Sequence, residues 1–369
     1  LVAVNRILRS NNITTPDLMA MLDLVALATI ADVAPLTGLN RAFVRQGLAV
    51  MTRRNRVGLA ALSDAARLTS APNSYHLGFV LGPRINAGGR IGKADLGARL
   101  LATTDPHEAA AMADQLSQLN EERREIEAMV RIKAIEQAEE RGFDAPLVWA
   151  AGKGWHSGVV GIVASRLKEA SNRPSIVIGL EGGEGKGSGR SVTGVDLGSA
   201  IATCAHEGLL LKGGGHKMAA GLTVAEDKLE QAMERLAELL QKQGADKIGP
   251  KDLLLDGAIM PSAVTTELIE QLELAGPFGA GAPAPHFALP TQKITFAQRA
   301  GQNHLRLTAQ DANGGRIDAI CFRAYDGPIG PMLENHRGQS FHLAGRLEID
   351  EWGGRQKAKL RLEDAAVAN

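Results

Sequence analysis

Four short segments of this chain combine glycines with a cation or a hydroxyl group, and that combination can bind a phosphate. Glycines let backbone N–H groups approach an anion closely, while neighbouring cations add charge-assisted hydrogen bonds. Any one segment would be a weak signal, but four of them predict one composite anion site. The segments are Gly82–Arg90 (GPRINAGGR), Trp155–Gly161 (WHSGVVG), Gly187–Ser191 (GSGRS) and Gly213–Gly221 (GGGHKMAAG).

Two of the segments carry arginines suited to phosphate. Arg84 and Arg90 flank Asn86, and the proline and glycines around them predict a loop. Planar guanidinium groups bind phosphate through paired hydrogen bonds, but a tight turn with solvated arginines explains these residues equally well. Ser188 and Arg190 are two positions apart, so an extended backbone would present both to one side, where they could hold one phosphate. The alternative is a flexible hairpin tip, because the surrounding sequence is rich in glycine.

Histidines in the other two segments are candidate catalytic or ligand-binding residues. His156 precedes an expected helix, whose N-terminus would stabilise an anion, although a lone histidine is more often a packed or capping residue. His216 follows a turn formed by Gly213, Gly214 and Gly215, which leave it little to pack against. We therefore expect His216 and these glycines to contact the substrate.

Asp32 is the candidate metal ligand. It lies in the apolar run Leu24–Leu36, where a bare carboxylate would be costly unless it is paired, capped or bound to a metal. Capping of a turn before Pro35 is as good an interpretation as metal ligation. A Mn²⁺ or Mg²⁺ site takes roughly six ligands, most of them oxygen, so Asp32 would need partners from elsewhere.

Length and composition limit the number of domains, the partners and the cellular location that can be expected. The chain has 369 residues, 44% of them hydrophobic, enough for about two or three domains with cores of their own. Its formal net charge is zero, so nucleic-acid binding would have to come from a local basic patch. Cys204 and Cys321 form no metal or redox motif, and with no signal peptide or long apolar run we expect a cytoplasmic protein without membrane contact. The chain opens on Leu1 in an uncapped helical pattern, which predicts a piece of a longer protein.

The predicted elements would position these residues in an α/β multidomain fold. Residues 1–104 are predicted to be mostly helical, and a long helix is predicted from Asp105 to Arg141, with Asp105 as N-cap and Glu108 completing a capping box. Alternating strands and helices follow, up to residue 246. Five short strand-like runs then predict a small β-barrel; the OB-fold has this strand count, although pattern alone does not separate it from other small barrels. The runs are Lys293–Phe296, Leu305–Thr308, Ile317–Phe322, Phe341–Ile349 and Gln356–Leu362.

The expected barrel carries cations that could bind single-stranded nucleic acid. Such barrels use basic grooves and stacked aromatic side chains, each stacked base contributing roughly 1–3 kcal/mol. Only 4% of the residues are aromatic, so backbone electrostatics should dominate and affinity should fall steeply with salt. For any single aromatic, such as Trp352 or Phe322, a core position is the simpler interpretation. The candidate contacts are Arg306, Arg323, Arg346, Trp352, Lys359 and Arg361.

Taken in order, these segments resemble the RecJ family of single-stranded-DNA-specific exonucleases, within the DHH phosphoesterase superfamily. Besides the four glycine segments, the resemblance includes Ala31–Leu36, Gly276–Gly281 and Gly345–Trp352, so it covers essentially the whole chain. It implies four parts: the C-terminal part of a DHH catalytic domain over residues 1–104, a long connecting helix over 105–141, a DHH-associated substrate-binding domain over 142–246 and an OB-fold over 250–369.

The same resemblance implies an activity. Family members hydrolyse single-stranded DNA from its 5′ end in DNA repair and recombination, with two Mn²⁺ or Mg²⁺ ions that activate water. Single-stranded DNA with a 5′ end is then the substrate, a helicase and a single-strand-binding protein are expected partners, and a monomer is expected. By this likeness Asp32 is one metal ligand, Ser188, Arg190 and Arg90 form the pocket for the terminal phosphate, and Arg84, Asn86, His156 and His216 line the substrate cleft.

One departure from the family pattern concerns the metal site. The Asp-x-Asp segment and the Asp-His-His motif, which supply the other metal ligands in the family, do not occur in this chain. We therefore expect it to bind DNA or phosphate without appreciable nuclease activity. Two alternatives stay open. One is a DHH phosphodiesterase for short oligonucleotides or cyclic dinucleotides, against which the barrel and the long helix argue; the other is a non-catalytic single-strand-binding scaffold, which the lack of those motifs favours.

Overall fold

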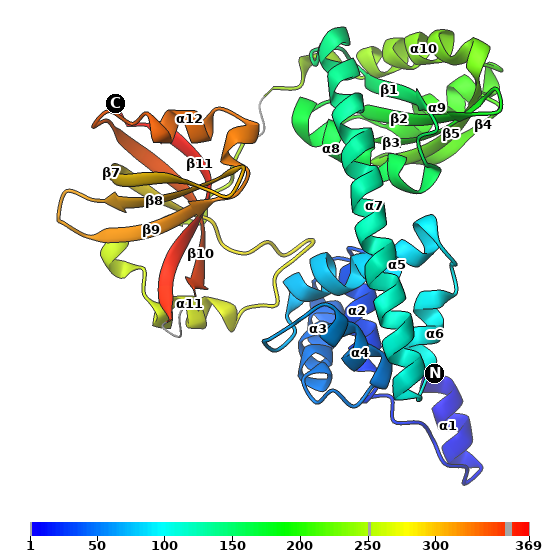
Figure 1. Cartoon of the computed structure of the whole chain (residues 1–369), viewed down its shortest axis with the longest axis horizontal. Helices are drawn as coiled ribbons and strands as arrows, with labels where there is room; N and C mark the ends of the chain where they lie inside the picture. The colour runs from blue at the N-terminus through cyan, green and yellow to red at the C-terminus, as the bar shows by residue number, and fades with distance from the viewer. Residues whose placement is uncertain (1, 250–251, 351–355, 369) are drawn as a thin grey trace. The chain divides into compact units, whose positions relative to one another are not determined.

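The computed structural model of the chain describes residues 2–249, 252–350 and 356–368 (Figure 1). Its elements form two compact units. One contains Leu1–Arg53, Pro72–Gly78 and Asp252–Asn369, and the other contains Arg54–Ala71 and Phe79–Lys251. Within the described residues, no helix combines the length and the apolar character needed to cross a membrane.

The first unit begins with three helices, α1 (Val2–Ser10), α2 (Leu22–Ala31) and α3 (Gly38–Met51). Helices α2 and α3 pack closely because Gly47 has no side chain: a Cβ atom there would lie 2.1 Å from the carbonyl oxygen of Leu22. The helical character predicted for this part of the chain is confirmed.

The segment after α2 is held by a loop from the C-terminal half of the same unit. The N–H group of Leu36 donates to the carbonyl oxygen of Ala280 at 2.7 Å. Arg41 on α3 donates to the carbonyl oxygens of Leu36 and Ala275 at 3.0 and 3.1 Å. These bonds anchor the chain at Leu36, four residues after the candidate metal ligand Asp32.

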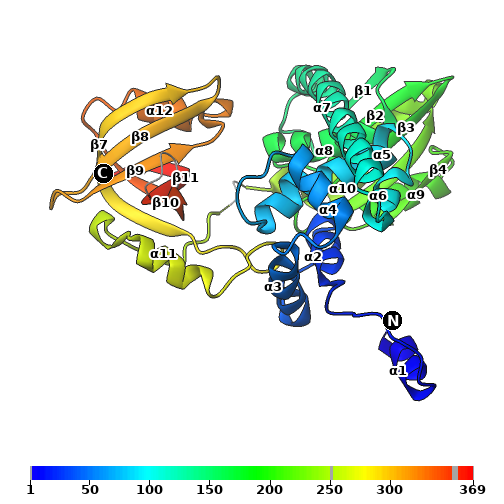
Figure 2. The ribbon, with the colours of Figure 1, turned by 60° about the horizontal axis from the view of Figure 1, so that its bottom comes forward.

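The rest of the first unit is a closed five-stranded barrel (Figure 2). Its strands pair in the order β10–β11–β9–β8–β7, and β10 also pairs with β7, which closes the sheet. Alternate residues point inward, such as Leu305, Leu307 and Ala309 of β8, and form the core. The small barrel that the sequence predicts is confirmed. Its elements are β6 (Gly257–Ala258), η4 (Pro261–Ala263), α11 (Thr266–Glu273), β7 (Phe287–Ala300), β8 (His304–Gln310), β9 (Arg316–Cys321), η5 (Ala324–Asp326), α12 (Ile329–Glu334), β10 (Ser340–Asp350) and β11 (Lys357–Val367).

The second unit contains the predicted long helix, α7 (Pro106–Arg141). The Asp105 carboxylate accepts hydrogen bonds from the N–H groups of His107 and Glu108, at 2.7 and 3.1 Å, which confirms Asp105 as the N-cap. The predicted capping box is wrong, because the Asp105 N–H does not donate to the Glu108 carboxylate. It donates to Oγ1 of Thr103 at 3.2 Å, and that hydroxyl donates to the Glu108 carboxylate at 2.6 Å. The shorter helices packed against α7 are α4 (Val57–Ala65), α5 (Gly82–Ile91) and α6 (Leu96–Ala102).

The segment Gly82–Arg90, for which the sequence predicts a loop, is helix α5, and a π-helix, η1 (His76–Leu81), precedes it. Pro83 falls in the first turn, where its missing N–H group costs nothing. A Cβ atom at Gly88 would lie 3.3 Å from Cδ2 of Leu116 on α7. The loop prediction is wrong because this glycine serves close helix packing rather than a turn.

The remainder of the second unit is a five-stranded sheet with helices on both faces (Figure 1). The strand order is β1–β2–β3–β5–β4, with β1 and β2 parallel and the other neighbours antiparallel. One face packs on α9 and α10 through residues such as Ile178, Leu222 and Leu236. The other face packs on α7 and α8 at β1 and β2, through Val163 and Val177 among others. The elements are β1 (Val148–Lys153), α8 (Ser157–Ser171), β2 (Ser175–Glu181), β3 (Glu184–Arg190), α9 (Leu197–His206), β4 (Lys212–His216), β5 (Ala219–Ala225), η2 (Glu226–Lys228), α10 (Leu229–Lys242) and η3 (Ala245–Lys247).

Both glycine-rich segments of this sheet are strands. Strand β3 pairs with β2 and β5 along its whole length, so the extended backbone expected at Ser188 and Arg190 is confirmed and the flexible hairpin tip is excluded. Residues 213–215, for which the sequence predicts a turn, belong to the edge strand β4, and the chain reverses later, at Lys217 and Met218. The turn prediction is wrong because pairing with β5 gives these glycines backbone partners.

Candidate phosphate and nucleic-acid interface

Ser188 and Arg190 meet the N-terminal half of α8 at Gly161. The two side chains lie on the same face of β3, and Nη1 of Arg190 donates to Oγ of Ser188 at 3.0 Å. A Cβ atom at Gly161 would lie 3.1 Å from that Oγ and 3.3 Å from Nη2 of Arg190, and both distances are tighter than ordinary contacts. Gly161 therefore leaves room for a hydroxyl and a guanidinium group side by side, a pair that can hold one phosphate.

Arg90 reaches the same helix from the end of α5. Its Nη1 donates to the carbonyl oxygen of Gly158 at 3.0 Å, and a Cβ atom at Gly158 would lie 2.2 Å from the carbonyl oxygen of Arg90. Burial lowers the pKa of Arg90, and the charges of Arg123 and Arg190 lower it further, while Glu127 raises it. Because arginine stays protonated at neutral pH, positive charge is concentrated where three of the four glycine segments meet.

Helix α7 contributes a buried arginine that the sequence analysis did not single out. Arg123 is 9% exposed, lies 2.6 Å from Glu127 and donates to Oδ1 of Asn120 at 3.1 Å. Its Nε is buried without a hydrogen-bond partner in the described part of the chain. A signal was present in the sequence, because Asn120 and Arg123 continue the buried stripe of Leu116 and put polar groups where apolar ones are expected.

His156 caps α8. Its Nδ1 accepts the N–H of Gly158 at 3.0 Å, so the capping interpretation is the one that the structure shows. A neutral ring that accepts at Nδ1 carries its proton on Nε2. The residue is exposed, and this second nitrogen is therefore the donor that it can offer to a ligand.

Arg84 and Asn86 lie on α5, but their surroundings differ from those of Arg90. Nη1 of Arg84 donates to the carbonyl oxygen of Val80 at 2.7 Å, and its Nε donates to Oγ of Ser117 at 3.3 Å. Burial is the main cause that lowers the pKa of Arg84. Asn86 is exposed. The guanidinium group of Arg84 thus joins α5 to α7. The loop prediction offered a phosphate-binding or a solvated arginine and did not include this structural role.

The strand register places His216 on the same face as Arg190. Arg190 pairs with Ala219, and Ala219 pairs with His216, so the three side chains form one row across β3, β5 and β4. Two interstrand spacings, about 10 Å, separate the ends of this row. The fourth glycine segment therefore shares the sheet face of Ser188 and Arg190.

Asp32, in the first unit, follows the last residue of α2. Its N–H group donates to the carbonyl oxygen of Ala28 at 2.9 Å, and the residue is exposed. The expectation of a costly, buried carboxylate is wrong, because the helix ends before Asp32 and leaves it in solvent. Across residues 2–249, 252–350 and 356–368, no group of three or more His, Cys, Asp or Glu side chains could hold a metal ion. These residues by themselves do not fit a divalent-metal site.

Three of the predicted DNA-binding arginines share one row on the outer face of the barrel. Arg306 pairs with Ile320, Ile320 pairs with Arg361, and Arg361 pairs with Arg346. Arg306 is exposed. Arg361 is held by a carboxylate, with Nη1 at 3.1 Å from Oε1 of Glu348.

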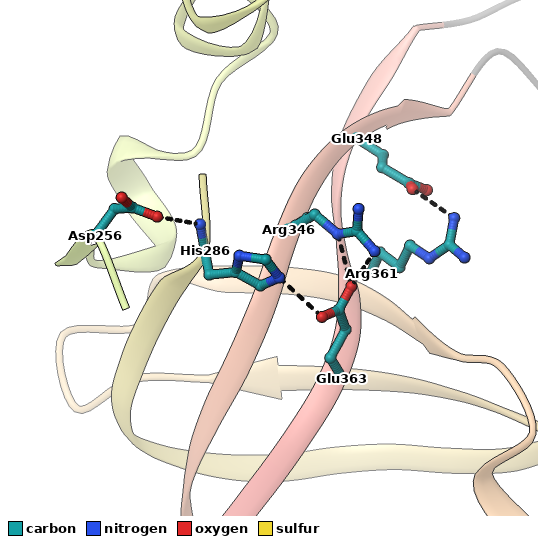
Figure 3. Close-up of polar contacts among 6 residues, drawn as sticks. All are labelled: Asp256, His286, Arg346, Glu348, Arg361 and Glu363. Carbon is teal, nitrogen blue, oxygen red and sulfur yellow. Dashed lines mark hydrogen bonds and ion pairs between the residues drawn. The ribbon is translucent and has the colours of Figure 1, made fainter. Parts of the chain in front are cut away.

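Carboxylates also hold other predicted cations of the barrel (Figure 3). Glu363 accepts from Nε of Arg346 at 2.6 Å, and its other oxygen lies 2.9 Å from Nε2 of His286. Nζ of Lys359 lies 3.6 Å from Asp350. The outer face therefore offers less free positive charge than its arginines and lysines suggest in sequence.

Phe322, which is exposed, and His304, which is partly buried, form a pair of rings beside Arg361. Phe322 is 47% exposed, its ring centroid lies 5.2 Å from that of His304, and Cζ of Arg361 lies 5.0 Å from it. The core interpretation of Phe322 is wrong, because Phe322 lies in the turn after β9 with its side chain in solvent. A cavity of about 290 Å³ is lined by Phe322 together with Arg323 and Arg361. Trp352 lies outside the described residues.

Two protein-family models match the chain. The DHHA1 domain matches residues 144–242, which contain the sheet with Ser188 and Arg190. The RecJ OB domain matches residues 255–364, which contain the barrel. The class of protein is therefore one with a DHH-associated α/β domain followed by an OB-type barrel, as the sequence predicts.

Known proteins match nearly the whole chain. It is 37% identical over 367 residues to the single-stranded-DNA-specific exonuclease RecJ of Dickeya dadantii, a match that covers 94% of this chain and 61% of that protein. Two crystal structures of RecJ from Thermus thermophilus, one with Mg²⁺ and one with Mn²⁺, each match with a TM-score of 0.79 and 30% identity. The Mg²⁺ match covers 97% of this chain and 53% of the RecJ chain. The Mn²⁺ match covers 98% of this chain and 51% of the RecJ chain. Over nearly its whole length the chain is similar to members of the RecJ family, and it spans about three fifths of the length of the curated relative.

Proposed function

We propose that this chain recognises the DNA end and the DNA strand for a single-stranded-DNA-specific exonuclease. The observation that supports this most is the convergence of Arg90, Ser188 and Arg190 beside Gly158 and Gly161. A hydroxyl and two guanidinium groups supply donors for a terminal phosphate, and the two glycines let these groups approach α8 closely. The RecJ relatives, named as exonucleases specific for single-stranded DNA, support the substrate class.

For the complete enzyme we propose hydrolysis from 5′ to 3′ in DNA repair and recombination, with a helicase and a single-strand-binding protein as partners. His156 and His216 would contact the strand next to the terminal phosphate, and Arg84 and Asn86 would contribute through α5. Asp32 stays a predicted metal ligand, but the described residues do not supply the rest of a metal site. The proposed parts are the end of the catalytic domain (1–104), the connecting helix (105–141), the substrate-binding domain (142–246) and the OB-fold (250–369).

The barrel is proposed to bind the body of the strand. The exposed ring of Phe322, which packs against His304, can stack on bases, and Arg306 and Arg361 can attract the phosphate backbone. Because Arg361 is also paired with Glu348, we expect modest affinity and a strong salt dependence.

The test is a binding assay with fluorescent oligonucleotides, single- and double-stranded, each with and without a 5′-phosphate, over a salt series. We expect preference for the phosphorylated single strand. Arg190→Gln should remove about tenfold or more of that preference, as expected for the loss of a charge-assisted hydrogen bond. The matched control is Arg166→Gln, because Arg166 lies on α8 and pairs with Glu169 at 2.9 Å. Equal binding of phosphorylated and unphosphorylated strands would contradict the proposal.

For the chain alone we expect no Mn²⁺-dependent digestion of the same oligonucleotides. Digestion that a chelator abolishes would show that the chain supplies a functional metal site after all.

A further inference from the structure

The glycines of the sheet fall into two groups. Some are required by packing: a Cβ atom at Gly213 would lie 2.7 Å from Cγ2 of Ile201. Gly214 and Gly221 are different, because a Cβ atom at Gly214 would have no neighbour within 4 Å, and at Gly221 the nearest would be a carbonyl oxygen at 3.8 Å. Neither residue has a positive φ angle. Nothing in the fold therefore requires the absence of these two side chains.

These two glycines lie side by side next to the candidate phosphate site. Gly214 pairs with Gly221, and Gly221 pairs with Ser188, so the three residues form one row on one sheet face. Both glycines are exposed. We call Gly214 and Gly221 the glycine floor. Bare backbone of this kind lets a ligand approach closely.

Cations stand on both sides of the glycine floor. One flanking row ends in Arg190 and His216, and the other ends in Lys186 and Lys212, with the hydroxyl of Thr223 between the lysines. The two rows are four residues apart along β3, about 13 Å. Lys186 and Lys212 are exposed, and in the described part of the chain neither belongs to an ion pair.

We propose that Lys186 and Lys212 form a second phosphate subsite, in which a single strand crosses the glycine floor from the terminal-phosphate pocket to a phosphodiester held by the two lysines. The inference rests on the proposed binding of the terminal phosphate by Ser188 and Arg190. Charge complementarity favours this occupant, because two separated cation rows match a chain of anions better than one isolated anion. Glu184, the next outward residue of β3 beyond Lys186, bounds the basic surface at that end.

The experiment compares two probes that compete with a fluorescent single strand for the whole chain. One is a 5′-phosphorylated mononucleotide, which has a single phosphate, and the other is a 5′-phosphorylated trinucleotide, which adds two phosphodiesters. The double variant Lys186→Gln/Lys212→Gln should weaken trinucleotide binding about tenfold and leave mononucleotide binding unchanged. The slope of log K against log salt for the trinucleotide should fall by about 0.7 for the lost phosphate contact. Lys242→Gln is the control, because this exposed lysine ends α10, on the opposite face of the sheet.

A second variant tests the glycine floor without removing charge. Gly214→Ala adds a methyl group where a Cβ atom has no protein neighbour within 4 Å, so thermal unfolding should be unchanged while trinucleotide binding weakens more than mononucleotide binding. Unchanged trinucleotide affinity in both variants would overturn the subsite. If Arg190→Gln still weakened the binding of both probes, the proposed function would stand without it. Failure of the unmodified chain to bind either probe would overturn the proposed function and the subsite together.

Discussion

The sheet of the second unit and the barrel of the first both carry partly buried arginines on one strand face, but the groups around these arginines differ. Arg190 contacts a neutral hydroxyl, Ser188, and lies next to Gly161, which has no side chain. On the barrel, Arg346 and Arg361 contact carboxylates that offset their charge. The sheet is therefore suited to holding a terminal phosphate at a fixed place, whereas the barrel needs its aromatic rings in addition to weak, salt-screened attraction.

The largest effect should come from filling the space at Gly161. Gly161→Ala would place a methyl group 3.1 Å from Oγ of Ser188 and 3.3 Å from Nη2 of Arg190, so these groups must move apart. We expect the preference for a 5′-phosphate to fall about tenfold or more, because a charge-assisted bond is lost. Stability should be maintained, since alanine favours a helix over glycine by up to about 1 kcal/mol. Oligonucleotide titration and thermal unfolding measure the two effects.

The control for that substitution is Lys168→Ala, on the same helix. It should change neither quantity. If Gly161→Ala kept the full preference for the phosphorylated end, the fixed-place description of the sheet would be wrong.

On the barrel, removal of a ring should outweigh removal of a charge. Phe322→Ala is expected to weaken binding of a longer single strand about tenfold, within the roughly 1–3 kcal/mol attributed to one stacked base. The loss should persist at high salt, and the preference for a 5′-phosphate should not change. Phe296→Ala is the matched control, since Phe296 is 48% exposed on β7. Equal losses from both substitutions would argue against a specific stacking role for Phe322.

A smaller effect of opposite sign is expected at Glu363. Glu363→Gln removes the carboxylate that accepts from Arg346, so more positive charge becomes available to a phosphate backbone. Affinity for single strands should rise about threefold at low salt, in line with the small energy of a surface ion pair, and the salt dependence should become steeper. Glu334→Gln, which alters a pair with Arg299 instead, is the control. A fall in affinity would mean that Glu363 positions Arg346 for binding rather than neutralising it.

A final effect, on stability rather than on binding, concerns one feature that the two regions share. Burial, with lesser contributions from nearby acidic residues, raises the pKa of Cys204 and of Cys321 to about 11. The folded state therefore favours the protonated thiols, and the stability that this provides is complete below about pH 9 and is lost as pH rises toward 11. Urea unfolding between these values should show a smaller decline for the Cys204→Ala/Cys321→Ala variant than for the unmodified chain. Parallel declines would show that the thiols do not contribute.

Local sequence patterns determined much of the fold and the neighbourhood of the site. The Asp105 cap and the uninterrupted helix to Arg141, the spacing of Ser188 and Arg190, and the alternation of the barrel strands each depend on residues close together in the chain. Such patterns act through backbone geometry and side-chain periodicity, which a short stretch of sequence already contains. They were enough to predict the architecture and three segments that the structure brings together.

The tertiary structure alone decided what individual residues contact. Packing against α7 made Gly82–Arg90 a helix and engaged Arg84, while Arg90 reached Gly158. Pairing with β5 made residues 213–215 a strand and distinguished the glycines that packing requires from the two that it does not. These outcomes depend on atoms contributed by distant parts of the chain. The sequence therefore determined which residues could bind a phosphate, and only folding decided which of them are free to do so.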